Sequence, residues 1–168
     1  KLKSAIELKR SLTNNTLKIE IDADNFQINE HKVGDISIIS SGNTQINSYG
    51  IDILVEKNKL RTLKGNGSLL GIDINPRLDI DLKFDKFNLD FLSPIGKENI
   101  KNIRGDVTGD VNLWGPIESP YHTGKLKLNN SGLKINYINA DYSFIDSAEI
   151  LLVNQSFNLN KTKFIDSK

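Results

Sequence analysis

The residues best placed to do chemistry are Asp79, Asp81 and Asp85, three carboxylates at odd positions of one stretch. Glycoside cleavage uses two carboxyl groups that flank a bond, and side chains two residues apart on a β-strand lie close together on one face. Lys83 lies among the aspartates, however, and hydrophobic residues fill the even positions. We therefore interpret the aspartates as the solvated face of a strand, and we expect no catalytic residues.

Two further stretches resemble ligand-binding loops only superficially. Residues 65–71 are rich in glycine, but their spacing does not fit the dinucleotide-binding pattern, and neither a Lys-Ser or Lys-Thr pair nor a helix follows to hold a phosphate. Residues 22–30 begin like a calcium loop, but Phe26 occupies a ligand position and Gln27 replaces the glycine of the turn. We expect a bent strand and a polar hairpin, with no metal and no cofactor.

The histidines, the lack of cysteine and the net charge restrict the class of protein. His31 and His122 lie in separate turn-rich segments without a carboxylate cluster, so we expect solvated loop histidines. Cysteine is absent, which excludes a disulfide framework and thiolate metal sites. The 22 basic and 21 acidic residues give a net charge of +1. That balance does not fit a nucleic-acid partner bound through phosphate neutralisation.

The elements that carry these residues are predicted to be β-strands. In residues 103–115 the odd positions hold Ile, Val, Leu or Gly, whereas the even positions hold Arg, Asp, Thr, Asn and Trp. A period of two is typical of a strand with one apolar and one wet face. Residues 78–85 alternate even more cleanly. Roughly a dozen such runs, with turn signals about every ten residues, predict an all-β fold.

Several segments are expected to interrupt the strands. Turn-forming residues predict turns at 24–25 and 129–132. A serine followed by a proline predicts one short helix near residues 94–101. Trp114 and Tyr121 flank a proline-rich turn, so we expect a small aromatic contact between them at a sheet edge.

A sheet with one apolar face must bury that face. A sandwich, a closed barrel, or a strongly curved sheet around an elongated apolar groove would each do so. Four glycines occupy alternate strand positions that otherwise hold hydrophobic residues: Gly105, Gly109, Gly115 and Gly124. Small residues there relieve crowding on a concave face or permit a strong bend, whereas a sandwich core would want bulk. The glycines therefore favour an elongated, strongly curved, antiparallel-rich sheet.

One succession of residues resembles the C-terminal region of the TamB family, the translocation and assembly module subunits of the AsmA-like superfamily. The similarity is strongest over residues 91–146 and closest to the versions of Bacteroidetes-type Gram-negative bacteria. It is carried, in order, by Phe91-Leu92-Ser93-Pro94, Ile103-Arg104-Gly105, Gly109, Leu113-Trp114-Gly115, Pro120, Gly124-Lys125-Leu126, Gly132-Leu133 and Tyr137-Ile138-Asn139. Trp114 departs from the family pattern, in which small or polar residues are usual, so no family role is assigned to it.

The resemblance implies a non-enzymatic protein that spans the periplasm and is anchored in the inner membrane by a part outside this chain. Residues 1–168 would then be a single β-taco segment, a sheet folded around a hydrophobic groove, from a much longer protein. Such proteins are thought to conduct phospholipids between the inner and outer membranes. The C-terminal region is also linked to an outer-membrane barrel protein of the TamA/BamA type and to outer-membrane protein assembly.

On this hypothesis, inward apolar side chains line the groove and shield phospholipid acyl chains. The expected lining residues are Ile80, Leu82, Phe84, Val107, Val111, Leu113, Leu126, Leu128, Ile135, Tyr142 and Phe144. The same residues would also suit a closed core.

Two other functions remain open. The first is a binding module whose exposed sheet edge pairs with strands of a nascent outer-membrane protein or of the barrel partner. The second is a carbohydrate-active or adhesive β-solenoid, which would require a regular coil repeat that the chain does not show. The edges exposed by excising a segment can also drive artificial dimers.

Overall fold

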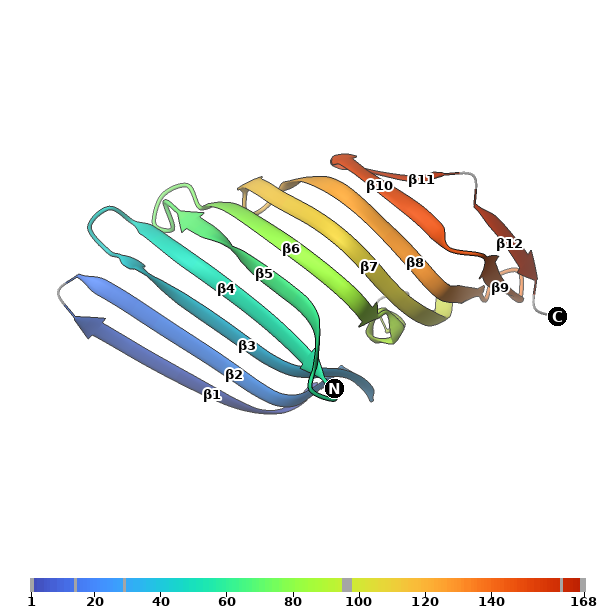
Figure 1. Ribbon diagram of the computed structural model, residues 1–168, viewed down its shortest axis with the longest axis horizontal. Coiled ribbons are helices and arrows are strands. Elements are labelled where there is room, and N and C mark those ends of the chain that lie inside the picture. Colours follow the sequence, from blue (N-terminus) through green and yellow to red (C-terminus); the bar gives the residue numbers. More distant parts are fainter. Residues whose placement is uncertain (1, 14, 29, 95–97, 161, 167–168) are drawn as a thin grey trace.

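The computed structural model describes residues 2–13, 15–28, 30–94, 98–160 and 162–166, and these form one antiparallel sheet of 12 strands (Figure 1). Neighbouring strands follow chain order from β1 to β8, and β8 then pairs with both β9 and β10. The predicted all-β fold, with a curved antiparallel sheet, is confirmed. The strands are β1 (Leu2–Thr13), β2 (Thr16–Ile28), β3 (His31–Asn43), β4 (Ser48–Lys57), β5 (Leu60–Leu70), β6 (Arg77–Asn88), β7 (Ile100–Pro116), β8 (Tyr121–Ile135), β9 (Ala140–Ile145), β10 (Ala148–Asn154), β11 (Ser156–Asn160) and β12 (Lys163–Asp166).

The described residues on either side of the centre of the predicted helix near residues 94–101 are not helical. The helical element of the described chain is a single 3-10 turn, η1 (Asp90–Leu92), and β7 already begins at Ile100. Ser93 closes this turn, because its backbone N–H donates to the carbonyl oxygen of Asp90 at 3.0 Å. Residues 95–97 lie outside the described residues. No helix among the described residues has the length and apolarity to cross a membrane.

Two predicted turns are instead irregularities inside continuous strands. Asn25, in β2, and Asn130, in β8, have left-handed backbone conformations with φ of 50° and 47°. Asparagine tolerates this conformation, which serves a β-bulge as readily as a turn. Both strands continue to pair with their neighbours beyond the asparagine. The predicted turn at 129–132 therefore does not divide residues 121–135, which form the single strand β8.

Bulges in four of the strand pairs from β2 to β8 lie close to one line and bend the sheet. Register shifts fall between Ala23 and Phe26 on β2, Val55 and Glu56 on β4, Phe84 and Phe87 on β6, and Arg104 and Asp106 on β7. The residues next to these shifts pair from strand to strand in one row, which runs through Ala23, Ile36, Val55, Leu63 and Phe84. Because each bulge bends its strand, this line of bulges folds the sheet along its width.

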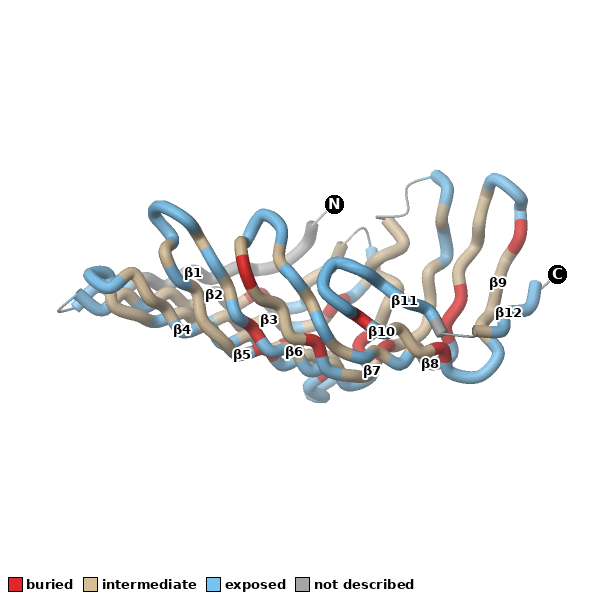
Figure 2. The backbone as a smooth tube through the Cα atoms, turned by 90° about the horizontal axis from the view of Figure 1, so that it is seen from above, coloured by how far each residue is buried: buried red, intermediate tan, exposed pale blue. Residues whose placement is uncertain are grey.

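The same line continues to the C-terminal side of the sheet. β10 pairs with residues 122–128 of β8, and β9 pairs with residues 132–135 of the same edge. β9 and β10 are therefore two halves of one long strand, interrupted at Asp146, whose φ is 64°. β12 and β11 extend the sheet beyond them. In Figure 2 the result is a trough, with its lowest part around β5 to β7 and the β9 end rising on one side.

The core lies at this bend. Val33, Val55, Phe87 and Val107 form its buried cluster, and Phe91 of the η1 turn packs against it. Phe87 meets Phe91 edge to face, with ring centroids 5.4 Å apart. The η1 turn contacts β3 and β7, which are separated by three strands. The apolar side of the sheet is therefore its concave side.

Backbone conformation explains two of the glycines that suggested a curved sheet. Gly109 and Gly124 have φ of 144° and 151°, which L-residues rarely adopt. A Cβ atom would also clash with the carbonyl oxygen of Lys125 at Gly109 and of Asp110 at Gly124. β7 and β8 can approach this closely only because both positions lack side chains.

Candidate functional site: the apolar face

Strand register brings eight of the expected lining residues onto one face. Directly opposed residues of antiparallel strands point to the same side of a sheet. β6 and β7 pair Ile80 with Leu113 and Leu82 with Val111, and a third pair joins Val107 to Leu128 of β8. We call this side the apolar face; its expected members on β6, β7 and β8 are Ile80, Leu82, Phe84, Val107, Val111, Leu113, Leu126 and Leu128.

The other three expected residues, Ile135, Tyr142 and Phe144, lie beyond the bend. The bulge at Asn130 adds one residue to β8. The apolar face therefore changes from the even positions of β8 before the bulge to the odd positions after it. Ile135 pairs there with Ile100 of β7 and Ala140 of β9. The Tyr142 ring meets that of Phe164 on β12 at 5.1 Å, edge to face. All 11 expected residues therefore share one face, divided by the bend.

This face is only partly covered. Ile80, Val107 and Val111 are buried, and the other eight expected residues are half-buried. No side chain in the described part of the chain is less than 2% exposed. A packed sandwich would bury such a face against a second layer, whereas within the described part of the chain only η1 lies over part of it. The arrangement is an open, curled sheet with a wide surface of half-buried hydrophobic side chains.

The apolar face extends well beyond the expected residues. Register continues it through β5, β4, β3 and β2, where further half-buried or buried hydrophobic side chains lie. The prediction omitted these strands although they show the same alternation. The added members are Leu17, Ile19, Ile21, Ala23, Ile36, Ile38, Tyr49, Ile51, Ile53, Val55, Leu63 and Leu69.

The prediction for His122 is wrong. His122 belongs to β8, opposite Leu113 on one side and Asn154 on the other, and therefore lies on the apolar face. Its ring centroid is 4.6 Å from that of Phe157. Its Nδ1 atom is buried and has no hydrogen-bond partner among the described residues. The alternation of residues 122–128 was the signal that could have placed it in a strand.

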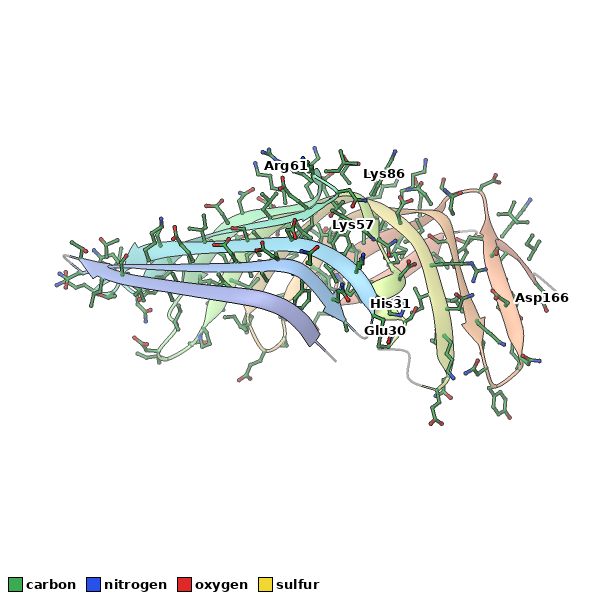
Figure 3. All side chains as sticks on the ribbon, turned by 90° about the horizontal axis from the view of Figure 1, so that it is seen from below. Glu30, His31, Lys57, Arg61, Lys86 and Asp166 are labelled. Atoms are coloured by element: carbon green, nitrogen blue, oxygen red, sulfur yellow. The ribbon has the colours of Figure 1, made fainter. Side chains whose placement is uncertain are left out.

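The opposite face is polar, as Figure 3 shows for Arg61 and Lys86, which project from the convex side. The aspartates singled out by sequence lie here, and Asp79 and Asp81 are exposed. The Nδ2 atom of Asn112 donates to both, at 3.0 Å to each Oδ1 atom. This shared hydrogen-bond donor is consistent with solvated strand residues.

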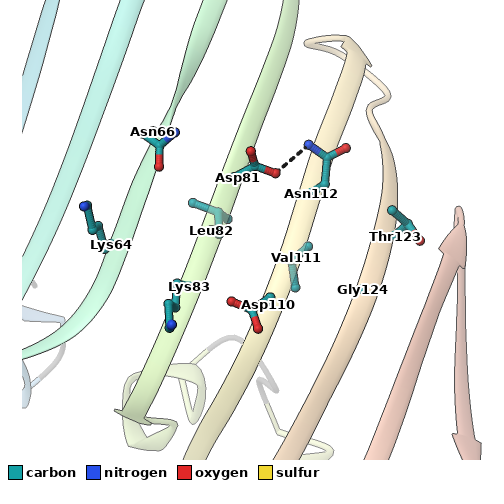
Figure 4. Close-up of a pocket in the computed structure, with 10 residues that line it drawn as sticks. All are labelled: Lys64, Asn66, Asp81, Leu82, Lys83, Asp110, Val111, Asn112, Thr123 and Gly124. Atoms are coloured by element: carbon teal, nitrogen blue, oxygen red, sulfur yellow. Dashed lines mark hydrogen bonds between the residues drawn. The ribbon is translucent and has the colours of Figure 1, made fainter.

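A hollow of ≈ 490 Å³ lies on the same polar face, and its lining includes Lys64, Asp81, Lys83, Asp110 and Asn112 (Figure 4). Acidic and basic side chains alternate around it, so it has no strong charge of one sign. Among the described residues, no group of three or more His, Cys, Asp or Glu side chains could hold a metal ion. Leu82 and Val111 also border this hollow, although their side chains belong to the apolar face by register.

The expected aromatic contact is confirmed, but it does not lie at a sheet edge, because β7 and β8 are interior strands. Trp114 and Tyr121 are register partners at the ends of β7 and β8, and their rings stack with centroids 5.8 Å apart. They lie on the polar face, next to the turn that joins the two strands. Comparisons with protein-family models, curated proteins and solved structures find no match to this chain.

Proposed function

We propose that the chain is a non-enzymatic segment of a TamB-like periplasm-spanning protein, and that its apolar face shields phospholipid acyl chains on their way between the inner and outer membranes. The observation that supports this most is the continuity of the apolar face over β2 to β10, with most of its side chains only half-buried. A soluble protein rarely leaves so long a hydrophobic surface without a ligand or partner.

The driving force would be removal of apolar surface from water. Burial is worth about 25 cal/mol per Å², or about 0.8 kcal/mol for each methylene group. An acyl chain lying along the trough would contact side chains from the floor and from the rising β9 end. The phosphate headgroup would stay at the open side, where it keeps its water and avoids the cost of burying a charge.

The wider context belongs to the same proposal. The full protein would be anchored in the inner membrane and reach an outer-membrane barrel protein of the TamA/BamA type. Its sheet would continue beyond this segment.

Lipid bound to the purified chain tests the proposal. We expect mass spectrometry to find co-purified phospholipid with the wild type, and its loss in Val111→Asp and Leu126→Asp variants that remain folded by circular dichroism. Thr123→Asp is the matched control, because this neighbouring position is exposed on the polar face. Lipid-free wild type, or equal lipid in all variants, would overturn the proposal.

A second candidate function rests on the free edge of the sheet. In the described chain β1 pairs only with β2, so its other edge offers unpaired backbone groups over 12 residues. Such an edge can add a strand from an outer-membrane protein or barrel partner. Proline substitutions in β1 that spare lipid binding but abolish capture of an extended partner strand would favour this function. If the proline variants still captured the partner strand, the β1 edge would be excluded as its binding site.

A further inference from the structure

One rim of the trough carries exposed isoleucines where turns normally carry polar residues. The turns at the upper ends of the strands in Figure 1 comprise residues 44–47, 71–76 and 117–120. Each contains at least one exposed isoleucine: Ile46 is 73% exposed, Ile72 45%, Ile74 92% and Ile117 43%. We call these three turns the isoleucine rim. Turns at a solvated surface favour Gly, Pro, Asn, Asp and Ser, so a large aliphatic side chain at the tip of three successive turns needs a reason.

Hydrogen bonds tie the rim into one continuous element. The N–H of Gly71 donates to the carbonyl oxygen of Asn47 at 3.0 Å, and the N–H of Ile117 donates to that of Pro76 at 3.0 Å. The Nδ2 atom of Asn47 also donates to Asp73 Oδ2 at 3.1 Å. Each turn is therefore fixed to the next, and the isoleucines are held in a row before any partner arrives. Such preorganisation lowers the ordering cost of binding.

The same links extend to the turns on either side. The N–H of Thr44 donates to the carbonyl oxygen of Asn15, beside the β1–β2 connection, at 2.8 Å. The Nε2 atom of Gln155, between β10 and β11, donates to the carbonyl oxygen of Ser119 at 3.3 Å. The isoleucine rim is thus the centre of a chain of linked turns that crosses the sheet from β2 to β11.

We infer that the isoleucine rim is a membrane-contact edge that inserts its exposed isoleucines into the headgroup region of a lipid bilayer. Neighbouring turns are two strands apart, so the tips are separated by about 10 Å along a line. Together they expose a few hundred Å², less than the ~800 Å² per partner of a stable protein interface. A bilayer needs no shape complementarity, and shallow insertion of separate apolar side chains suffices to bind it.

Aromatic residues and charge fit this partner. The Trp114–Tyr121 stack lies directly below the turn that carries Ile117, and Tyr121 is 43% exposed. Tyrosine and tryptophan prefer the boundary between headgroups and acyl chains. The rim contains Asp73 and Glu118 but no lysine or arginine. Binding is therefore driven by apolar contact, requires no anionic lipid, and is insensitive to salt.

This inference does not rest on lipid bound to the apolar face, and the two can fail separately. Trp114 is the only tryptophan of the chain and lies on the polar face beside the rim. Its emission therefore reports on the rim. We expect phosphatidylcholine vesicles to shift this emission to shorter wavelength and brominated lipids to quench it. Adding phosphatidylglycerol should not strengthen the binding.

The deciding variant is Ile46→Ser with Ile74→Ser and Ile117→Ser, which should weaken vesicle binding by roughly 100-fold. Leu60→Ser is the matched control, because Leu60 is 70% exposed at the opposite rim, next to Lys57, Lys59 and Arg61. It should bind like the wild type. Absence of wild-type binding, equal binding by the triple variant, or binding that requires anionic lipid and disappears in salt would overturn the inference. So would a vesicle-independent dimer that the triple variant abolishes, since the partner would then be a second copy.

Discussion

At the scale of single residues, close approach of β7 to β8 depends on glycine. Gly124 combines a φ of 151° with a carbonyl oxygen where its Cβ would lie. The alternation of polar and apolar residues placed Gly124 on the apolar face. The alternation could not show the backbone conformation that requires glycine at this position.

We expect Gly124→Ala to lower the free energy of unfolding by about 2 kcal/mol or more, because strain and a backbone clash add together. Gly50→Ala is the control: Gly50 is exposed in β4, and its Cβ would meet only the Ser41 carbonyl oxygen, at 3.6 Å. It should change stability by no more than about 1 kcal/mol. Urea denaturation measures both, and similar values would contradict this account of the glycine.

His122 supports a second prediction at this scale. Its buried Nδ1 atom has no hydrogen-bond partner among the described residues, and Phe157 lies beside its ring. Replacing it with leucine removes an unsatisfied polar atom from the apolar face. We therefore expect His122→Leu to stabilise the fold by about 1 kcal/mol in thermal denaturation. A destabilised variant would show that the imidazole makes a favourable interaction.

At the scale of elements, the line of bulges and the η1 turn shape the trough. Phe87 lies where they meet: it is buried with Val33, Val55 and Val107, and it contacts the rings of Phe84 and Phe91. Its side chain joins the bent strands to the turn that covers them. The curvature thus depends on packing as well as on bulges.

Phe87→Ala should lower the free energy of unfolding by about 3–5 kcal/mol, because it leaves a cavity in the core. Phe157→Ala is the matched control, since Phe157 is 69% exposed in β11, and it should cost less than about 1 kcal/mol. Chemical denaturation of both variants would decide the matter. A small effect at Phe87 would mean that η1 does not fix the bend.

Sequence reasoning succeeded where a single strand carries its own signal. The alternation in β6 and β7 predicted both the strands and the face that their side chains occupy. It failed at Asn25 and Asn130, because a left-handed asparagine favours a turn and a bulge alike, and only pairing with neighbouring strands distinguishes them. The alignment of bulges across the sheet depends on register, which no single strand encodes.

At the scale of the whole molecule, the trough has an apolar concave side and a charged convex side. Among the described residues, no second layer covers most of the apolar face, so many of its hydrophobic side chains remain partly exposed. Side chains of the apolar and polar faces alternate along residues 122–129 of β8. This alternation allows a test that distinguishes lipid bound on the apolar face from nonspecific adsorption of lipid.

Photo-crosslinking along β8 tests the central claim most directly. A photoreactive phenylalanine analogue is placed in turn at Lys125, Leu126, Lys127 and Leu128, and the chain is irradiated with phospholipid bound. Only Leu126 and Leu128 face the apolar side, since they pair with Gly109 and Val107. The account predicts lipid adducts at these two positions and not at the two lysines. Equal labelling of all four positions, or labelling of the lysines alone, would contradict it.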